Sequence, residues 1–409
     1  MRRPLGTLMS TIGVSALALS VGTAVPRHAG DGELLYLGTR NGIAVVDSTT
    51  GDTMLSARDA LPSGDWSQIL RARAAGNGST VVEAVDPVTG EILRTQRFDE
   101  ELSVRAVSLH GDLVALMPRE PGRYGGNGLY RPASRDETRI VLTHLDGSAP
   151  RSIDLDANVE PEAFSNDNAA LFVIRYAPAL HPDRYRVSRL DLSTGELGYV
   201  FTNEKELQGD MRGIAYTQVV APDGTKVYTF YKKPDGEAFV HVLNLDQQFA
   251  NCVDLPEGFG TDPAAVAITT TPQGGQVIVV DGAARTMVDV DATELKVLRT
   301  KPFRGVPTTG ERIVAVATPS GVYVSSERSV VELSRVTGRR MQAWSTDGRV
   351  QALHLGTTGL VLVAEGDRVT AYNSRGGGRS WSVKVPEGGI RSVADTLPYT
   401  AKGSVDCAC

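Results

Sequence analysis

Apolar and polar residues alternate in short runs along most of the chain. In a typical unit, an apolar run such as 43–47 (IAVVD) leads into a turn of the form Asp-x-x-Thr-Gly and continues as a more polar run. Short runs rich in Val, Ile, Tyr and Leu and bounded by Gly and Asp predict β-strands joined by tight hairpins. No apolar periodicity indicates a helix of more than a turn or two. The pattern therefore predicts an all-β protein.

This hairpin recurs eight times, with its turn aligned at positions 51, 90, 147, 195, 246, 293, 338 and 377, so that successive copies are 39 to 57 residues apart. A second turn earlier in each period, as in 219–231 (VVAPDGTKVYTFY), adds another hairpin. A period of four short strands is typical of one blade of a β-propeller. The sequence predicts eight four-stranded antiparallel blades, with seven as the alternative if one period is degenerate.

The two ends of the repeat region complement each other. The first period begins at 34–39 (LLYLGT) and lacks its innermost strand, whereas 389–399 forms a spare strand after the last complete period. Pairing these two segments would close the ring and remove its open edges.

The recurring turn residues are predicted to be structural. An Asp side chain accepts hydrogen bonds from amides two residues further on, Thr does so more weakly, and Gly takes the positive φ of the turn. These aspartates are therefore not read as catalytic carboxylates.

The N-terminus has the pattern of a secretory signal. Arg2 and Arg3 precede an uncharged stretch at 8–25, and Gly22 and Ala24 would stand at positions −3 and −1 of a cleavage site. We expect a signal peptide at 1–24, a linker at 25–33, the propeller at 34–399 and a flexible tail at 400–409. The expected location is secreted or on the exterior of the cell envelope, with tethering by an uncleaved signal anchor as the alternative. No second long apolar run follows, so no membrane span is expected in the mature chain.

The net charge and the cysteine content limit the kinds of protein that this sequence can encode. The formal net charge is −6, which argues against a nucleic-acid binder. The three cysteines are Cys252, Cys407 and Cys409, so a disulfide between Cys252 and one tail cysteine would leave one thiol over. The alternative is that the cysteines of the tail are incidental. A monomer is expected.

Two repeats resemble a known family. The segments 36–52 (YLGTRNGIAVVDSTTGD) and 227–246 (VYTFYKKPDGEAFVHVLNLD) are similar to the repeats of YVTN-type β-propellers. These exported proteins are grouped with the quinoprotein-dehydrogenase-like and lactonase-like propellers. The resemblance implies the fold over roughly 34–399 but no particular activity, because such propellers include enzymes, binders and structural proteins. No repeat in this chain keeps the full tetrapeptide of the family.

No catalytic constellation stands out. The histidines, none of which forms a pair at metal-ligand spacing, are His28, His110, His144, His181, His241 and His354. A Gly-x-Ser-x-Gly elbow is absent. Catalytic residues therefore stay unassigned and no cofactor is predicted. A divalent metal enters only with the alternative function, a lactonase-like or other hydrolase with its active site at one mouth of the central channel.

Two insertions break the regular spacing. The segment 119–137 contains Arg123, Tyr124, Tyr130 and Arg131, and the segment 178–186 contains His181, Arg184 and Tyr185. Both fall between the second and third strands of adjacent periods, so we expect them to be neighbours on one face of the ring. Tyr and Arg often carry the binding energy of interfaces, although solvated loops would have the same composition. These seven residues are predicted to form a binding surface for a protein, glycan or small ligand on a non-catalytic scaffold.

Overall fold

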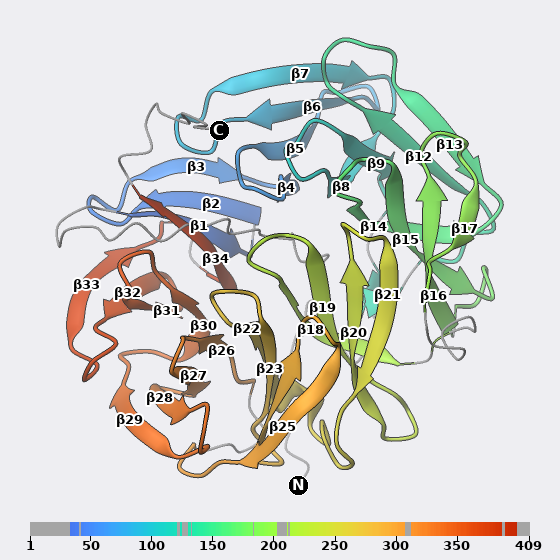
Figure 1. Ribbon diagram of the computed structural model, residues 1–409. Coiled ribbons are helices and arrows are strands. Elements are labelled where there is room, and N and C mark those ends of the chain that lie inside the picture. The colour runs from blue at the N-terminus through green and yellow to red at the C-terminus, as the bar shows by residue number, and fades with distance from the viewer. Residues whose placement is uncertain are drawn as a thin grey trace, which may run out of the picture.

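The computed structural model describes residues 33–40, 42–120, 123–124, 130–131, 133–182, 184–202, 211, 213–306, 312–386 and 389–398. They form eight four-stranded antiparallel sheets arranged as blades around a central axis (Figure 1). The eight-bladed propeller predicted from the sequence is confirmed. In each blade the strands are called a to d, from the axis outwards.

Blades 1 to 4 have the following strands in the order a to d. Blade 1 consists of β34 (Ser392–Pro398), β1 (Glu33–Thr39), β2 (Gly42–Asp47) and β3 (Thr53–Ala57). Blade 2 consists of β4 (Ala60–Pro62), β5 (Ile69–Ala74), β6 (Thr80–Val85) and β7 (Ile92–Phe98). Blade 3 consists of β8 (Leu102–Val107), β9 (Val114–Pro118), β12 (Thr138–Thr143) and β13 (Arg151–Leu155). Blade 4 consists of β14 (Asn158–Phe164), β15 (Ala170–Ala177), β16 (Arg184–Asp191) and β17 (Leu197–Tyr199).

Blades 5 to 8 complete the ring. Blade 5 consists of β18 (Ile214–Val220), β19 (Lys226–Lys232), β20 (Ala238–Asn244) and β21 (Phe249–Asp254). Blade 6 consists of β22 (Val266–Thr270), β23 (Gln276–Asp281), β24 (Thr286–Asp291) and β25 (Lys296–Pro302). Blade 7 consists of β26 (Ala315–Ala317), β27 (Gly321–Ser326), β28 (Ser329–Ser334) and β29 (Arg340–Ser345). Blade 8 consists of β30 (Val350–Leu355), β31 (Val361–Glu365), β32 (Arg368–Tyr372) and β33 (Arg379–Lys384).

Blade 1 is completed by both ends of the chain. Strand β34 pairs antiparallel with β1, with Leu34 opposite Leu397 and Leu37 opposite Val393, as predicted from the two unmatched end segments. The same pairing brings Ile390 and Val393 into the apolar cluster between blades 8 and 1. The ring is therefore fastened by hydrogen bonds and by burial of apolar surface together.

Hydrophobic clusters fill the junctions between neighbouring blades. Alternation along each strand sends successive side chains to opposite faces of the sheet, so that each blade contributes to two junctions. The largest cluster lies between blades 5 and 6 and includes Tyr228, Phe230 and Val279. The cluster between blades 4 and 5 is much smaller, with seven buried members at its centre. The cluster between blades 7 and 8, which includes Tyr323 and Val363, also has seven buried members.

Each c–d turn packs on the outer strand of the preceding blade. In the turn of blade 2, the Asp86 carboxylate accepts hydrogen bonds from the amides of Val88 and Thr89, at 2.7 and 2.8 Å. Gly90 has a φ of +71°, and a Cβ there would lie 3.3 Å from the carbonyl oxygen of Met54 in β3. The predicted structural role of the turn residues is thus confirmed, and the close approach gives the glycine a second reason.

Helical structure is minimal in the described residues, where the helical element is a short 3-10 turn, η2 (Pro263–Ala265), capped by Asp262. Within the same part of the chain, no helix has the length and apolar character needed to cross a bilayer. The connections that matter for the site are instead the loops between strands b and c, which emerge on one face of the ring. This face is called the b–c face.

Candidate functional site

The first insertion carries a small hairpin of its own. Strands β10 (Arg123–Tyr124) and β11 (Tyr130–Arg131) pair antiparallel, with Arg123 opposite Arg131 and Tyr124 opposite Tyr130. The side chains of these four residues lie outside the description, so their predicted part in a binding surface stays a prediction. The hairpin leaves and rejoins blade 3 between β9 and β12, as the sequence indicated.

Asn158 brings the two insertions together. At the start of β14, its buried side-chain amide donates hydrogen bonds to the carbonyl oxygens of Ala133 and Ala179, at 2.6 and 2.8 Å. Arg135 strengthens the contact, because it donates to the Val159 carbonyl and forms an ion pair with Glu120. The insertions of blades 3 and 4 are therefore neighbours on the b–c face.

The second insertion is shorter than its sequence suggests. Strand β16 begins at Arg184, so that Arg184 and Tyr185 belong to the sheet, whereas His181 is exposed in the loop. The Tyr185 ring points between the blades and stacks on Tyr231 of β19, with the ring centroids 5.6 Å apart. Tyr185 thus connects the predicted surface with the junction of blades 4 and 5.

This junction contains a cluster of polar and aromatic side chains. Tyr231 also stacks on Phe239, at 5.3 Å between centroids, and meets the ring of His241 edge-on at 6.0 Å. Cys252 on β21 is directly opposite His241 on β20, so the two side chains share the sheet face that points to blade 4. Together with Glu162 of β14, these residues define the blade 4–5 cluster, whose titratable members are Glu162, Tyr185, Tyr231, His241 and Cys252.

Burial changes the protonation of this cluster. It raises the pKa of Glu162 to about 7, and the carboxylate oxygen Oε2 is enclosed without a hydrogen-bond partner among the described residues. Burial also raises the pKa of Tyr231, and the neighbouring Glu162 raises it further. The pKa of His241 falls to about 4 for the same reason, so its imidazole is neutral at physiological pH. The cluster can therefore offer a protonated carboxyl, neutral hydroxyls and a neutral imidazole.

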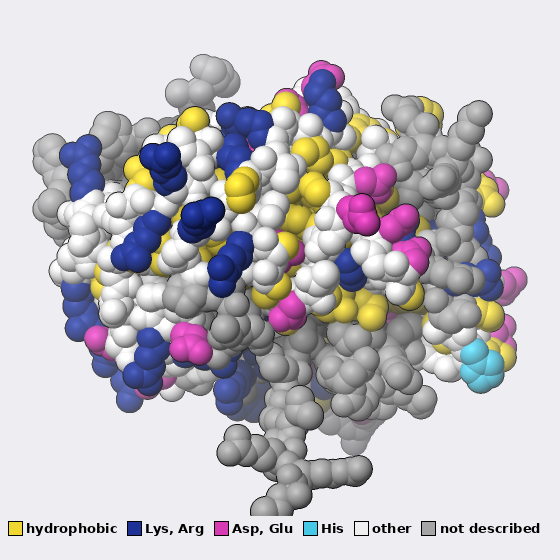
Figure 2. Space-filling model, turned by 90° about the horizontal axis from the view of Figure 1, so that it is seen from below, with side chains coloured by type: hydrophobic (Ala, Val, Ile, Leu, Met, Phe, Trp, Pro, Cys, Tyr) yellow, Lys and Arg dark blue, Asp and Glu magenta, His cyan; other side chains and the backbone are white. Residues whose placement is uncertain are grey.

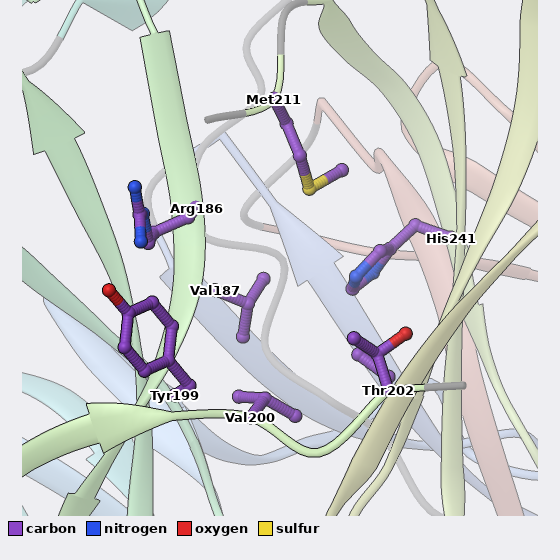
Figure 3. Close-up of a pocket in the computed structure, with 8 residues that line it drawn as sticks. Arg186, Val187, Tyr199, Val200, Thr202, Met211 and His241 are labelled. Atoms are coloured by element: carbon purple, nitrogen blue, oxygen red, sulfur yellow. The ribbon is translucent and has the colours of Figure 1, made fainter. Parts of the chain in front are cut away.

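A small cavity opens at the outer side of the cluster (Figure 3). Figure 3 shows the Met211 thioether and the His241 ring directed into it, and its lining consists of Arg186, Val187, Tyr199, Val200, Thr202, Met211, His241 and Ala250. Its volume of about 20 Å³ admits roughly one water molecule and is far below that of a small-molecule site. A ligand of this region would therefore lie across the surface.

The surface beside the cavity is aromatic and cationic. Arg186 lies over the Tyr199 ring, 5.3 Å from its centroid. Tyr199 is 71% exposed, and Phe201, two residues further on, is 68% exposed. Exposed aromatic rings next to arginine are the side chains that most often anchor a bound partner.

Three arginines gather at the mouth of the central channel. Arg312, Arg349 and Arg391 precede the innermost strands of blades 7, 8 and 1, which are consecutive around the ring. Burial lowers the pKa of Arg312, and the charges of the nearby Arg391 and Arg349 lower it further. Sequence reasoning missed this set, although each arginine stands just before the start of an inner strand.

The remaining candidates do not form a metal or disulfide site in the described residues. His110 pairs with Asp65 at 2.9 Å, His144 bonds to the carbonyl of Asp112, and His354 is enclosed in β30. In this part of the chain, no group of three or more His, Cys, Asp or Glu side chains could hold a metal ion. Cys407 and Cys409 lie outside the described residues, so the disulfide with Cys252 stays a prediction.

Comparisons with known proteins support the fold. No protein-family model matches the sequence. No curated protein matches it either. Among solved structures, apo AztD from Citrobacter koseri is 12% identical with a TM-score of 0.50, over 90% of this chain and 97% of AztD.

Two further structures are similar. Dihydro-heme d1 dehydrogenase NirN in complex with DHE is 11% identical with a TM-score of 0.49, over 90% of this chain and 78% of NirN. The periplasmic gluconolactonase PpgL of Pseudomonas aeruginosa is 17% identical with a TM-score of 0.41, over 88% of this chain and 99% of PpgL. At such identities the likeness concerns the fold alone.

Proposed function

We propose that this protein is a non-catalytic binding scaffold whose binding surface lies on the b–c face over blades 3 to 5. The observation that carries the proposal is the blade 4–5 cluster. Burying a carboxyl group and an imidazole costs free energy, and at this junction the Glu162 Oε2 atom has no hydrogen-bond partner among the described residues. This polar junction adjoins the insertion of blade 4 through Tyr185, and that insertion contacts the one of blade 3, so we attribute the junction to binding.

The chemistry of the surface limits the class of ligand. Exposed Tyr199 and Phe201 provide aromatic faces, and Arg186 provides a guanidinium group next to them. Such a surface suits a glycan or a protein segment that stacks on aromatic rings. A drug-sized molecule is disfavoured by the small volume of the cavity.

The test is a binding screen with matched variants. A glycan array and a peptide library would be probed with the full chain, with the Tyr199→Ala/Phe201→Ala variant, and with an Ile92→Ala/Leu93→Ala variant at exposed sites on blade 2. We expect ligands whose binding is lost at least tenfold in the aromatic variant and kept in the control. Ligands that bind all three proteins equally would overturn the assignment of the surface. Turnover of a lactone panel by the wild-type protein would favour the hydrolase instead.

We also propose that the protein is exported by its N-terminal segment. The support is the sequence pattern of two arginines, an uncharged stretch and small residues before Val25. When the full chain is expressed with a C-terminal tag in a bacterium that secretes proteins, we expect it outside the cytoplasm, with Val25 as the first residue by N-terminal sequencing. A chain that keeps Met1 and sediments with membranes would support the uncleaved anchor, and a cytoplasmic chain would exclude export.

A further inference from the structure

The outer rim of blades 6 and 7 combines basic and apolar side chains. Figure 2 shows Lys and Arg gathered on one half of this side, with hydrophobic side chains among them. The residues come from β25, the connection after it, the c–d turn of blade 7 and the start of β29. This strip is called the basic rim, and its exposed members are Lys296, Leu298, Arg299, Arg304, Val336, Arg339, Arg340 and Met341.

The basic rim is continuous across the blade boundary. A Cβ at Gly338 in the c–d turn of blade 7 would lie 2.3 Å from the carbonyl oxygen of Pro302, the last residue of β25. A Cβ at Gly305 would lie 3.4 Å from the Cδ of Arg340. The end of one outer strand therefore meets the beginning of the next, and the side chains of both form one surface.

Most of the positive charge on this surface is uncompensated. Lys296 forms an ion pair with Glu294 at 3.8 Å, and the buried Asp289 carboxylate forms ion pairs with both Arg299 and Lys301. Arg304, Arg339 and Arg340 form no ion pair with any described residue. The surplus is local, because the whole chain has a net charge of −6.

Arginines on the outer strands of other blades are used differently. Arg94 on β7 donates to the carbonyl oxygens of His144 and Gly111, and Arg151 on β13 donates to that of Leu192. These side chains join one blade to the next. Within the described part of the chain, the guanidinium groups of Arg304, Arg339 and Arg340 make no such contact with a neighbouring blade.

The apolar members of the strip are exposed. Leu298 is 38% exposed, Met341 is 54% exposed and Val336, at the tip of the c–d turn, is 72% exposed. Charged side chains alone would protect the outer strands from pairing with another sheet edge, so protection does not require these residues. Basic side chains mixed with exposed aliphatic ones are typical of surfaces that lie on an anionic membrane.

We propose that the basic rim docks on the surface of an anionic lipid bilayer. The arginines contact the lipid phosphates, and Val336 and Met341 enter the boundary between headgroups and acyl chains. A soluble polyanion would bind the arginines but would not explain why the aliphatic side chains are exposed beside them. The contact is peripheral and lies apart from the b–c face over blades 3 to 5, so that it is independent of the proposed scaffold function.

The test is co-sedimentation of the full chain with vesicles. Equimolar phosphatidylglycerol and phosphatidylcholine vesicles would be compared with pure phosphatidylcholine vesicles, at low salt and at about 0.5 M NaCl, where screening shortens the reach of charges to about 4 Å. We expect binding to the anionic vesicles only, with at least a tenfold decrease in the partition coefficient at high salt. Absence of binding to the anionic vesicles would overturn the proposal.

Matched variants identify the surface. Arg339→Glu/Arg340→Glu is expected to decrease the partition coefficient at least tenfold, whereas Arg40→Glu/Arg58→Glu, with the same change in net charge at exposed sites on blade 1, is expected to leave it within twofold. Val336→Ser/Met341→Ser keeps the charge and is expected to decrease it about threefold. Equal losses in both charge variants would show a nonspecific effect and overturn the assignment. If Val336→Ser/Met341→Ser has the partition coefficient of the wild type and soluble polyphosphate displaces the protein from the vesicles, the surface is a polyanion site. That result would overturn the membrane contact.

Discussion

At the scale of single residues, burial decides the chemistry of this propeller more than residue type does. Glu162 on β14 and Glu160 two positions away are both glutamates of an inner strand. Glu160 forms an ion pair with Arg135, whereas Glu162 has an enclosed oxygen without a partner and a pKa raised to about 7. Two glutamates of one strand thus differ, because Glu160 is held by an ion pair whereas burial favours the protonated form of Glu162.

The protonation of Glu162 makes stability depend on pH. Because its folded pKa of about 7 exceeds the ordinary value of 4.5, its contribution to stability is complete below pH 4.5 and is lost as the pH rises through 7. From urea unfolding we expect Glu162→Gln to be more stable than the wild type by about 2 kcal/mol at pH 8 and nearly equal to it at pH 5.

Glu160→Gln is the control for this experiment. It removes the ion pair with Arg135, so we expect a lower free energy of unfolding at both pH values. A Glu162→Gln variant with the same pH dependence as the wild type would show that Glu162 ionises normally.

Two buried histidines give a second prediction at this scale. Burial lowers the pKa of His241 and of His354 to about 4, below the ordinary value of 6.5. Stability from these groups is complete above pH 6.5 and is lost as the pH falls through 4. In a ¹⁵N NMR titration, both rings should stay neutral down to about pH 5, and a transition near pH 6.5 at either ring would contradict their burial.

At the scale of the element, the c–d turn is the unit that connects the blades. Its first residue accepts amide hydrogen bonds whether it is Asp86, Asn244 or Ser334, which explains why the turn survives changes of residue type. How strictly the turn requires glycine depends on how close the neighbouring blade lies to the Cα of that residue. A Cβ at Gly338 would meet a backbone carbonyl at 2.3 Å, whereas a Cβ at Gly147 would have no atom within 4 Å.

These two glycines form a matched pair for mutation. Both have positive φ, +68° at Gly338 and +86° at Gly147, so Ala at either position incurs about 1 kcal/mol of backbone strain. Gly338→Ala must also push the turn away from Pro302, which should cost about 2 kcal/mol more. Thermal and urea unfolding would measure the free energy of unfolding of both variants. Equal decreases would mean that the turn of blade 7 can move away from Pro302 without loss of stability.

At the scale of the whole molecule, the ring depends on its last strand. Without β34, the inner edge of β1 would be open and the cluster between blades 8 and 1 would lose Ile390 and Val393. An open propeller has two exposed edges, which favours aggregation.

Truncation tests this closure. A chain that ends at Pro386 should lose cooperative unfolding and aggregate, whereas a chain that ends at Tyr399 should keep the Tm of the full chain within about 2 °C. Scanning calorimetry and size-exclusion chromatography would make the comparison. A stable monomer ending at Pro386 would mean that the closure contributes little to the fold.

The sequence alone determined the architecture of this protein. Strand alternation has a period of two residues and the turns need Asp and Gly at fixed places, so local chemistry repeats eight times and can be counted along the chain. Even the closure by β34 followed from an unmatched segment at each end. The position of the two insertions was predictable for the same reason, because loops that join equivalent strands emerge on the same face.

Only the tertiary structure decided which side chains meet between blades. Glu162, Tyr185, Tyr231 and His241 come from four strands of two blades, and nothing in their spacing marks them. The basic rim likewise arises because the end of β25 meets the next c–d turn. Burial and charge at such places depend on how blades pack, which is a property of contacts far apart in the sequence and therefore of the folded ring.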